Sequence, residues 1–211
     1  MNNILLELHY LPNIQYFSKI IAADKVWIEA HENYQKRSYR NRTEIASANG
    51  LLRLSIPLQK GKNEQQSIRD VKIAYEETWQ SQHWHAIQSA YRNAPYFDFY
   101  ADELKVFYKE KTTFLFEYNW KLLELMLGFV DPSKELIPTD QYQKQIHPST
   151  IDFRNKINPR KPQFSEDPSF NPARYVQVFE DKHGFLPNLS ILDLLFCMGP
   201  SAILILEQSI Q

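Results

Sequence analysis

The N-terminal part of the chain switches between two patterns of apolar positions. Residues 4–8 form a short apolar run interrupted by Glu7, which is typical of a buried strand. After a break at Pro12, apolar residues recur at intervals of three and four over residues 14–21, which is the spacing of a helix face. Residues 25–30 return to a strand-like pattern. The pattern therefore predicts a strand, a loop, a helix and a second strand.

This predicted unit places polar residues at the ends of its two strands. If the strands are parallel, the unit is a right-handed crossover, with His9 and Tyr10 at the carboxyl end of the first strand. His31 and Glu32 then follow the second strand. Ligands of open α/β sheets bind outside the carboxyl ends of the strands. We therefore expect residues 9–12 and the chain after His31 to face one crevice.

Further strand signals follow. Residues 42–46 and 52–57 flank Asn49-Gly50, which predicts a hairpin because both turn residues tolerate positive φ. Residues 68–73 alternate between apolar and polar side chains and are predicted as another strand.

The second half of the chain is mostly helical in its periodicity. A helix is expected from about Thr78, and Pro95 ends it. Residues 102–127 predict two helices that meet near residues 111–113, and residues 191–196 predict another. The fold class is therefore α/β, with an N-terminal βαβ-type unit and a β-hairpin forming a mixed sheet, followed by a mostly helical half.

Residues 131–172 lose this periodicity and hold most of the prolines. We expect this segment to be a proline-rich irregular excursion or a lid. The full length of 211 residues and 25.0 kDa fits a single α/β domain, residues 1–211, that includes it.

Charge and composition limit the location of the protein. The formal net charge is only -1, which argues against a general nucleic-acid partner. The N-terminus lacks the features of a secretory signal, and no apolar run approaches the ~20 residues that a membrane span needs. We expect a cytoplasmic protein with no membrane span. Its oligomeric state is left open.

Positive charge is nevertheless concentrated after the second strand. Arginine pairs with phosphate or carboxylate through two parallel hydrogen bonds, so such a stretch suits a phosphorylated or nucleotide-linked small molecule. The alternative is that carboxylates of the protein itself, from Glu32, Glu44 and Asp70, neutralise the cations. The candidate ligand-binding residues are Tyr10, Tyr16, Tyr34, Lys36, Arg37, Tyr39, Arg40, Asn41 and Arg42.

Two histidines are candidates for catalysis. His9 stands at a strand end, where an imidazole with a pKa of about 6.5 can act as a general base. His83 lies near the start of the helix predicted from Thr78. The alternative for His9 is a structural hydrogen bond to its loop. No zinc spacing, phosphate-binding glycine loop or dinucleotide fingerprint occurs, so we expect no metal and no cofactor.

Taken together, several segments resemble the WbqC-like family, in the form common in Bacteroidota. The matching segments include Tyr10-Leu11-Pro12, residues 32–36, residues 39–42, Ala48-Asn49-Gly50, Ile68-Arg69-Asp70-Val71, His83-Trp84 and residues 177–200. The resemblance implies an association with O-antigen and related surface-polysaccharide synthesis, as a transferase-like enzyme that uses a nucleotide-linked sugar or an acyl donor. Other branches carry a longer Gln-Pro-x-Tyr-x-Pro-Trp start, and Glu7, Leu8 and Asn13 depart from it here.

Three functional hypotheses remain. The first is a metal-independent transferase, in which cations hold the donor phosphates and a base deprotonates the acceptor. The second is a non-catalytic protein that binds an anion, single-stranded nucleic acid or an acidic partner through the basic stretch. The third is a structural protein in which Arg37, Arg40 and Arg42 each face a carboxylate and no crevice exists.

Overall fold

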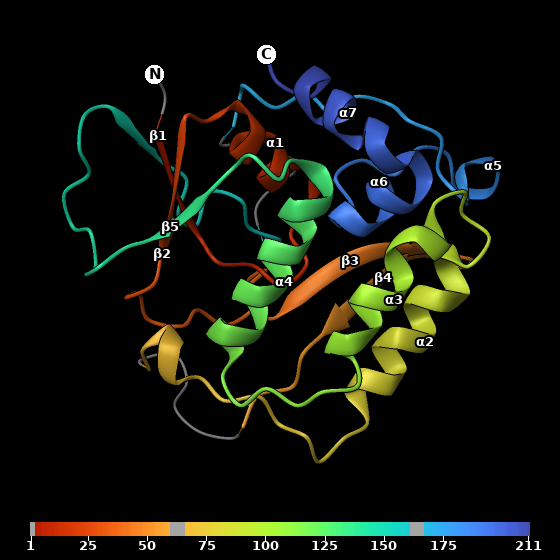
Figure 1. The fold of residues 1–211 in the computed structure, drawn as a ribbon, viewed down its shortest axis with the longest axis horizontal. Helices are drawn as coiled ribbons and strands as arrows, with labels where there is room; N and C mark the ends of the chain where they lie inside the picture. The colour runs from red at the N-terminus through yellow and green to blue at the C-terminus, as the bar shows by residue number, and fades with distance from the viewer. Residues whose placement is uncertain (1–2, 60–65, 161–166) are drawn as a thin grey trace.

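A parallel sheet of four strands, in the order β5-β2-β1-β6, organises one side of the molecule (Figure 1). The computed structural model describes residues 3–59, 66–160 and 167–211. The strands are β1 (Asn3–Glu7), β2 (Lys25–Glu29), β3 (Arg42–Ser47), β4 (Gly50–Ser55), β5 (Leu136–Pro138) and β6 (Thr150–Asp152). The helices are α1 (Ile14–Ala22), η2 (Ile68–Asp70), α2 (Trp79–Tyr91), α3 (Phe97–Phe107), α4 (Leu115–Val130), α5 (Glu180–His183), α6 (Ile191–Met198), η3 (Gly199–Ser201) and α7 (Ala202–Gln208).

The predicted β1-α1-β2 unit is confirmed, and its strands are parallel. In their register Leu5 lies beside Trp27 and Glu7 beside Glu29. Because side chains alternate along a strand, these four residues share one face of the sheet. The other face, which includes Ile4, belongs to the main hydrophobic core. The sheet thus has an apolar face toward the core and a face that ends in carboxylates.

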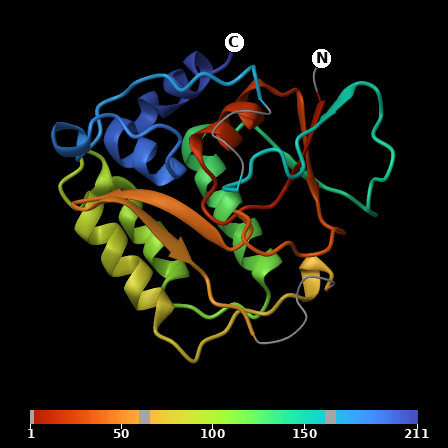
Figure 2. The ribbon, with the colours of Figure 1, turned by 180° about the vertical axis from the view of Figure 1, so that it is seen from behind.

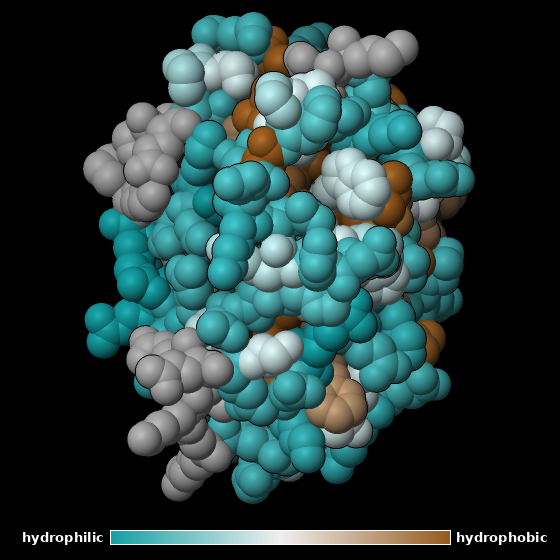
Figure 3. All heavy atoms as spheres, turned by 90° about the vertical axis from the view of Figure 1, so that its left-hand side faces the viewer, coloured by the Kyte–Doolittle hydropathy of each residue, from teal (hydrophilic) through white to brown (hydrophobic). Residues whose placement is uncertain are grey.

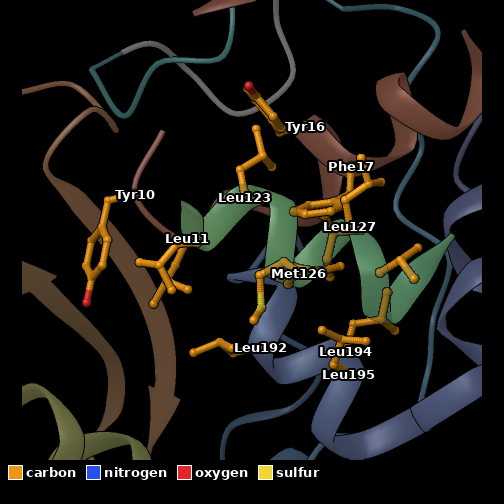
Figure 4. Packing of buried hydrophobic residues seen from close by; sticks show 14 of the residues in the cluster. Tyr10, Leu11, Tyr16, Phe17, Leu123, Met126, Leu127, Leu192, Leu194 and Leu195 are labelled. Carbon is orange, nitrogen blue, oxygen red and sulfur yellow. The ribbon is translucent and has the colours of Figure 1, made fainter. Parts of the chain in front are cut away.

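The core lies between the sheet and the helices. Side chains of α1, α4 and α6 meet there, including Phe17, Met126 and Leu192 (Figure 4). The helices predicted in residues 78–95 and 102–127 are confirmed as α2, α3 and α4. The α/β class and the helical second half are therefore both confirmed.

The predicted hairpin is also confirmed, as β3 and β4, but it forms a separate sheet of two strands, so the prediction that it joins the βαβ unit in one mixed sheet is wrong. Its two-residue turn consists of Ala48 and Asn49, and Gly50 follows with a φ of 98°. A positive φ is costly for residues with a Cβ atom, which explains the glycine. The hairpin lies beside α2, where the backbone N–H of Ala46 donates to the hydroxyl of Tyr91 at 3.1 Å (Figure 2).

The strand predicted over residues 68–73 is wrong. Residues 68–70 form the short helix η2, and Ser67 caps it by accepting from the N–H of Arg69. Lys72 and Ile73 make only isolated bridges, to Phe114 and Leu58. The apolar residues of the segment are buried in the core, so their alternation reflects one-sided burial without a neighbouring strand.

Residues 131–172 contribute two strands that their sequence did not indicate. β5 and β6 are three residues long and form the two edges of the parallel sheet. Strands this short are too brief to show an alternating pattern. The chain between them projects from the side of the sheet (Figure 1). Residues 161–166 of the segment lie outside the described residues.

One stretch near the C-terminus is long and apolar enough to cross a membrane by length and composition. It is Ile191–Gln208, and 61% of it is buried inside the fold. The chain changes direction within it at Gly199, whose φ is 54°. A Cβ atom at this position would lie too close to Cδ1 of the Tyr96 ring, so a glycine is needed here. These features identify the stretch as a part of the core.

We predict that Leu192→Ala lowers the free energy of unfolding by about 2–5 kcal/mol, because it leaves a cavity in the core. Leu192 is 1% exposed and Leu204 is 53% exposed, so Leu204→Ala is the matched control and should change little. Urea unfolding measures both. Equal effects of the two substitutions would contradict this account of the core.

Candidate functional site

A polar pocket of about 350 Å³ lies outside the carboxyl ends of the parallel strands. Its lining residues are His31, Glu32, Asn33, Gln35, Tyr142, Arg154 and Asn155. We call it the polar pocket. Its position agrees with the general location of ligands in open α/β sheets. The side of the molecule from which the β5–β6 connection projects is largely hydrophilic, with only scattered hydrophobic patches (Figure 3).

The pocket is built from the chain segments that follow three different strands. Residues 31–35 follow β2, Tyr142 follows β5, and Arg154 and Asn155 follow β6. Asn155 has a φ of 61°, a left-handed conformation that asparagine tolerates better than most residues. Its backbone N–H donates to Glu7 Oε2 at 3.0 Å, which anchors this turn to the end of β1.

The guanidinium group of Arg40 lies directly behind the pocket and is fully buried. Its Nε donates to Glu32 Oε1 at 2.6 Å, and its Nη2 donates to Asn155 Oδ1 at 3.0 Å. Its Nη1 lies 3.7 Å from Glu7 Oε1 and has no hydrogen-bond partner among the described residues. Arg40 therefore orders the pocket from behind and has no exposed surface for a ligand.

A second ion pair, between Arg154 and Glu29 at the end of β2, supports the pocket. Arg154 Nη1 donates to Glu29 Oε2 at 2.7 Å, and Arg154 Nε donates to Asp152 Oδ1 at 3.0 Å. The Thr139 hydroxyl donates to Glu29 Oε1 at 2.9 Å. The guanidinium of Arg154 also lies 5.0 Å from the ring centre of Tyr142. Like Arg40, Arg154 is therefore paired with carboxylates of the protein itself.

Carboxylates outnumber guanidinium groups in this region. Around the two guanidinium groups of Arg40 and Arg154 lie the four carboxyl groups of Glu7, Glu29, Glu32 and Asp152. Among the described residues, no group of three or more His, Cys, Asp or Glu side chains has an arrangement that could hold a metal ion. Hydrogen bonds from neutral groups also reach these carboxyl groups, for example from the Thr139 hydroxyl to Glu29 and from the Asn155 N–H to Glu7.

The pKa values reflect this excess. Burial raises the pKa of Glu32 to about 7, and the charges of Glu7 and Glu29 add to the rise, while Arg40 opposes it. Burial alone would also raise the pKa of Glu7, but the charges of Arg40 and His9 lower it to about 2. The two carboxyl groups share one cation, so one ionises early and the other near neutral pH.

His9 lies at the end of β1 as expected, but its side chain is buried and lies outside the polar pocket. Its Nε2 is 3.0 Å from Glu7 Oε1, and its ring packs 4.8 Å from the ring of Tyr16. Burial lowers the pKa of His9, with Glu7 opposing. The geometry gives His9 a contact with Glu7 and none with the pocket.

His83 and Tyr10 form a separate buried group. The Tyr10 hydroxyl lies 3.0 Å from His83 Nδ1 and 2.8 Å from the Tyr108 hydroxyl. Burial lowers the pKa of His83 to about 4, so its imidazole is neutral at physiological pH. The backbone N–H of Tyr10 donates to the carbonyl of Tyr39 at 2.9 Å. The 9–12 loop and the basic stretch are thus adjacent, but the loop does not line the polar pocket.

The other predicted ligand residues divide by exposure. Tyr34 and Tyr16 are buried, and the Tyr34 hydroxyl donates to Asn41 Oδ1 at 3.0 Å. Tyr39, Asn41 and Arg42 are half-buried, whereas Lys36 and Arg37 are exposed.

A further cation, Arg160, interacts with Arg37 and Arg42. Arg160 Nε donates to the carbonyl of Arg37 at 3.2 Å. Burial lowers the pKa of Arg42, and the charges of Arg53 and Arg160 contribute to the shift. Arg42 Nε is buried without a hydrogen-bond partner among the described residues. We call Arg37, Arg42 and Arg160 the basic edge.

The basic stretch therefore has two roles that its sequence did not distinguish. Arg40 is neutralised internally by Glu32, as the alternative interpretation expected, whereas Arg37 and Arg42 belong to the basic edge. The polar pocket exists, so the arrangement required by the third hypothesis is not met.

Sequence reasoning missed Arg154, Asn155 and Tyr142. Only one local signal was present, the sequence Thr-Ile-Asp-Phe-Arg-Asn of residues 150–155, in which a short apolar element is followed by charged and amide side chains. The proline-rich surroundings obscured it.

Comparisons with known proteins cover this site. The WbqC-like protein family matches residues 8–159, a range that includes every residue lining the polar pocket. An uncharacterized protein of Mycobacterium tuberculosis (strain ATCC 25618 / H37Rv), Rv1507c, is 27% identical over 218 residues, with 94% of each chain covered. No solved structure matches the chain.

We predict that Arg40→Met lowers the free energy of unfolding by about 3–5 kcal/mol, because it leaves Glu7 and Glu32 buried without their cation. The matched control is Arg53→Met, since Arg53 forms a surface pair with Glu44 and its side chain is 52% exposed. Loss of a surface pair costs about 1 kcal/mol or less. Chemical denaturation compares the two, and similar small losses would contradict a structural role of Arg40.

The pKa of Glu32 predicts a pH dependence of stability. The folded pKa of about 7 lies above the ordinary 4.5, so the folded state holds the proton more tightly than the unfolded state. The contribution of Glu32 is therefore fully present below pH 4.5 and is lost as the pH rises to about 7. Relative to Glu32→Gln, the natural protein should lose unfolding free energy across this window. A constant difference between the two proteins would contradict it.

Proposed function

This chain belongs to the WbqC-like protein family, and we propose that its polar pocket binds the sugar part of a phosphorylated or nucleotide-linked ligand. We further propose that the protein is a metal-independent, transferase-like enzyme of surface-polysaccharide synthesis. A cytoplasmic location belongs to the same proposal.

The lining of the polar pocket supports a sugar. Asn33 and Gln35 contribute amide groups that can donate to and accept from hydroxyl groups, and Glu32 contributes a carboxyl group. Because the surrounding carboxylates outnumber the guanidinium groups, a phosphate at the bottom of this pocket would meet a repulsive field. An uncharged, hydroxyl-rich group has no such penalty.

The basic edge supports a site for the phosphate. Burial lowers the pKa of Arg42, and repulsion from the charges of Arg53 and Arg160 lowers it further, so its cationic form is destabilised. A bound anion would relieve that repulsion, and the free Nε of Arg42 would gain an acceptor. The edge adjoins the pocket along the chain, since Gln35 lies in the pocket and Arg37 in the edge. Lys36 and Tyr39 stay predicted ligand residues in this proposal.

Glu32 is the proposed acid–base group. With a pKa of about 7 its carboxylate can accept a proton from an acceptor hydroxyl near neutral pH. In a transfer, the acceptor oxygen would bond to the anomeric carbon of the sugar, the bond from that carbon to the phosphate oxygen would break, and the proton would pass to Glu32. The phosphate would leave at the basic edge, where cations stabilise its charge.

The catalytic histidines predicted from the sequence take other parts in this proposal. His9 is proposed as a positioning residue, because it contacts Glu7, whose charge and whose pairing with Arg40 both act on Glu32. His83 lies in the buried group with Tyr10, and a direct role for it stays a prediction. The observation that carries the proposal is Glu32, a carboxyl group with a pKa of about 7 that lines the polar pocket.

Thermal-shift measurements test the proposal with nucleotide sugars, sugar phosphates and acyl donors. We expect at least one phosphorylated sugar to stabilise the protein, by about 2.7 kcal/mol at a concentration of 100 Kd. Asn33→Ala combined with Gln35→Ala should weaken its binding about tenfold, since each hydrogen bond contributes about 0.5–1.5 kcal/mol. Arg160→Ala should weaken the binding of the phosphorylated sugar and leave the binding of the free sugar unchanged.

The control is Arg92→Ala, which removes an exposed arginine just after α2. It should change the affinity for neither ligand. Absence of any response to all three ligand classes would overturn the binding proposal. Binding of arbitrary single-stranded oligonucleotides with a steep dependence on salt would favour the non-catalytic hypothesis instead.

A further inference from the structure

We infer that a second pocket, on the face of the parallel sheet opposite the core, binds a planar heteroaromatic ring such as a nucleobase. The cavity has a volume of about 350 Å³. Its lining residues are Asn3, Leu5, Trp27, Thr139, Gln143, Ile146, His147, Ser149 and Thr150. We call it the tryptophan pocket. The inference does not depend on what occupies the polar pocket.

The floor of this pocket is an apolar patch that lies outside the main core cluster. Leu5 and Trp27 are register neighbours on β1 and β2, and Ile146 comes from the β5–β6 connection. None of the three belongs to the main core cluster or to the partly buried residues packed against it. Leu5 is already buried, whereas Trp27 and Ile146 are half-buried and would gain from a ligand that covers them.

Trp27 differs from the other tryptophans. Trp79, Trp84 and Trp120 each pack against another aromatic ring, with centroids 5.1–6.2 Å apart. Within the described ranges, Trp27 has no ring contact, and its indole N–H has no hydrogen bond. Its side chain is half-buried at the pocket. Trp27 is therefore free to stack on a flat ring from outside.

The polar groups around this floor also lack partners. In the described part of the chain, the side-chain amides of Asn3 and Gln143 take part in no hydrogen bond, although the backbone of Gln143 is anchored to Glu29 and Arg154. The residues that line the pocket include no Asp, Glu, Lys or Arg, and one of them is His147. Nδ1 of the His147 imidazole accepts from the Ser149 N–H at 3.2 Å, which fixes the turn before β6.

This combination selects the class of ligand. An aliphatic chain would cover the apolar floor but would leave the amides and the indole N–H without partners, and a buried unpaired polar group is unfavourable. A nucleobase has a flat face for Trp27 and donors and acceptors along its edge for the amides of Asn3 and Gln143. The uncharged lining suits a ring better than it suits a phosphate or carboxylate.

Tryptophan fluorescence tests the inference with nucleosides, which lack the phosphate that the basic edge would bind. Adenosine, guanosine, cytidine and uridine are titrated into the natural protein, and at least one should quench the emission of Trp27 with saturation. Trp27→Ala should weaken that binding about 5- to 100-fold, as expected for loss of base stacking. Isothermal titration calorimetry measures this variant, since it no longer carries the reporter.

Two further variants keep the test decisive. Gln143→Ala removes only an unbonded amide and should weaken binding several-fold, even if Trp27→Ala fails to fold. Asn33→Ala combined with Gln35→Ala alters the polar pocket alone and should leave nucleoside affinity unchanged. Failure of all four nucleosides to bind would overturn the inference. Preference for an aliphatic acid or a monosaccharide at Trp27 would overturn it as well, while leaving the proposed function intact.

Discussion

The pairing of Arg40 with Glu7 and Glu32 is the constraint on which the site depends. Arg40 comes from the loop after β2, Glu7 from the end of β1, and Asn155 from the chain after β6, so one guanidinium group joins three distant segments. A fully buried cation is tolerated only when its partners stay in place. Displacing any of these segments would therefore leave a buried charge uncompensated. The polar pocket is ordered before a ligand arrives, which reduces the entropic cost of binding.

Alternation along the strands explains why the charges gather where they do. Every second residue of β1 and β2 faces the core, and the intervening residues run from Leu5 and Trp27 to Glu7 and Glu29 along the opposite face. β6 also ends in a carboxylate, Asp152. Glu7 and Glu29 are buried, and arginines from the following loops reach them there. The same periodicity that builds the core thus separates an apolar patch from a charged one.

The sequence was informative where elements are long and patterns repeat. The β1-α1-β2 unit, the β3–β4 hairpin and the helices α2 to α4 could all be predicted, because their apolar positions recur often enough to distinguish period two from period 3.6. β5 and β6 could not, since three residues carry no period. The prediction of the site was incomplete for the same reason. Glu32 and its loop were placed correctly after β2, whereas Arg154 and Asn155 depend on β6 and were missed.

Local charge was the least reliable guide, because a run of cations does not reveal which of them the protein uses itself. Arg40 forms an ion pair with Glu32, whereas Arg37, only three positions earlier, is exposed to solvent. Their difference arises from tertiary structure, since only Arg40 lies where β1 and β6 bring Glu7 and Asn155. Once the internal pairs are removed from the count, negative charge remains at the polar pocket and positive charge at the basic edge. The proposed ligand, a phosphorylated sugar, matches this separation because it is uncharged at one end and anionic at the other, whereas a simple inorganic anion has no uncharged end.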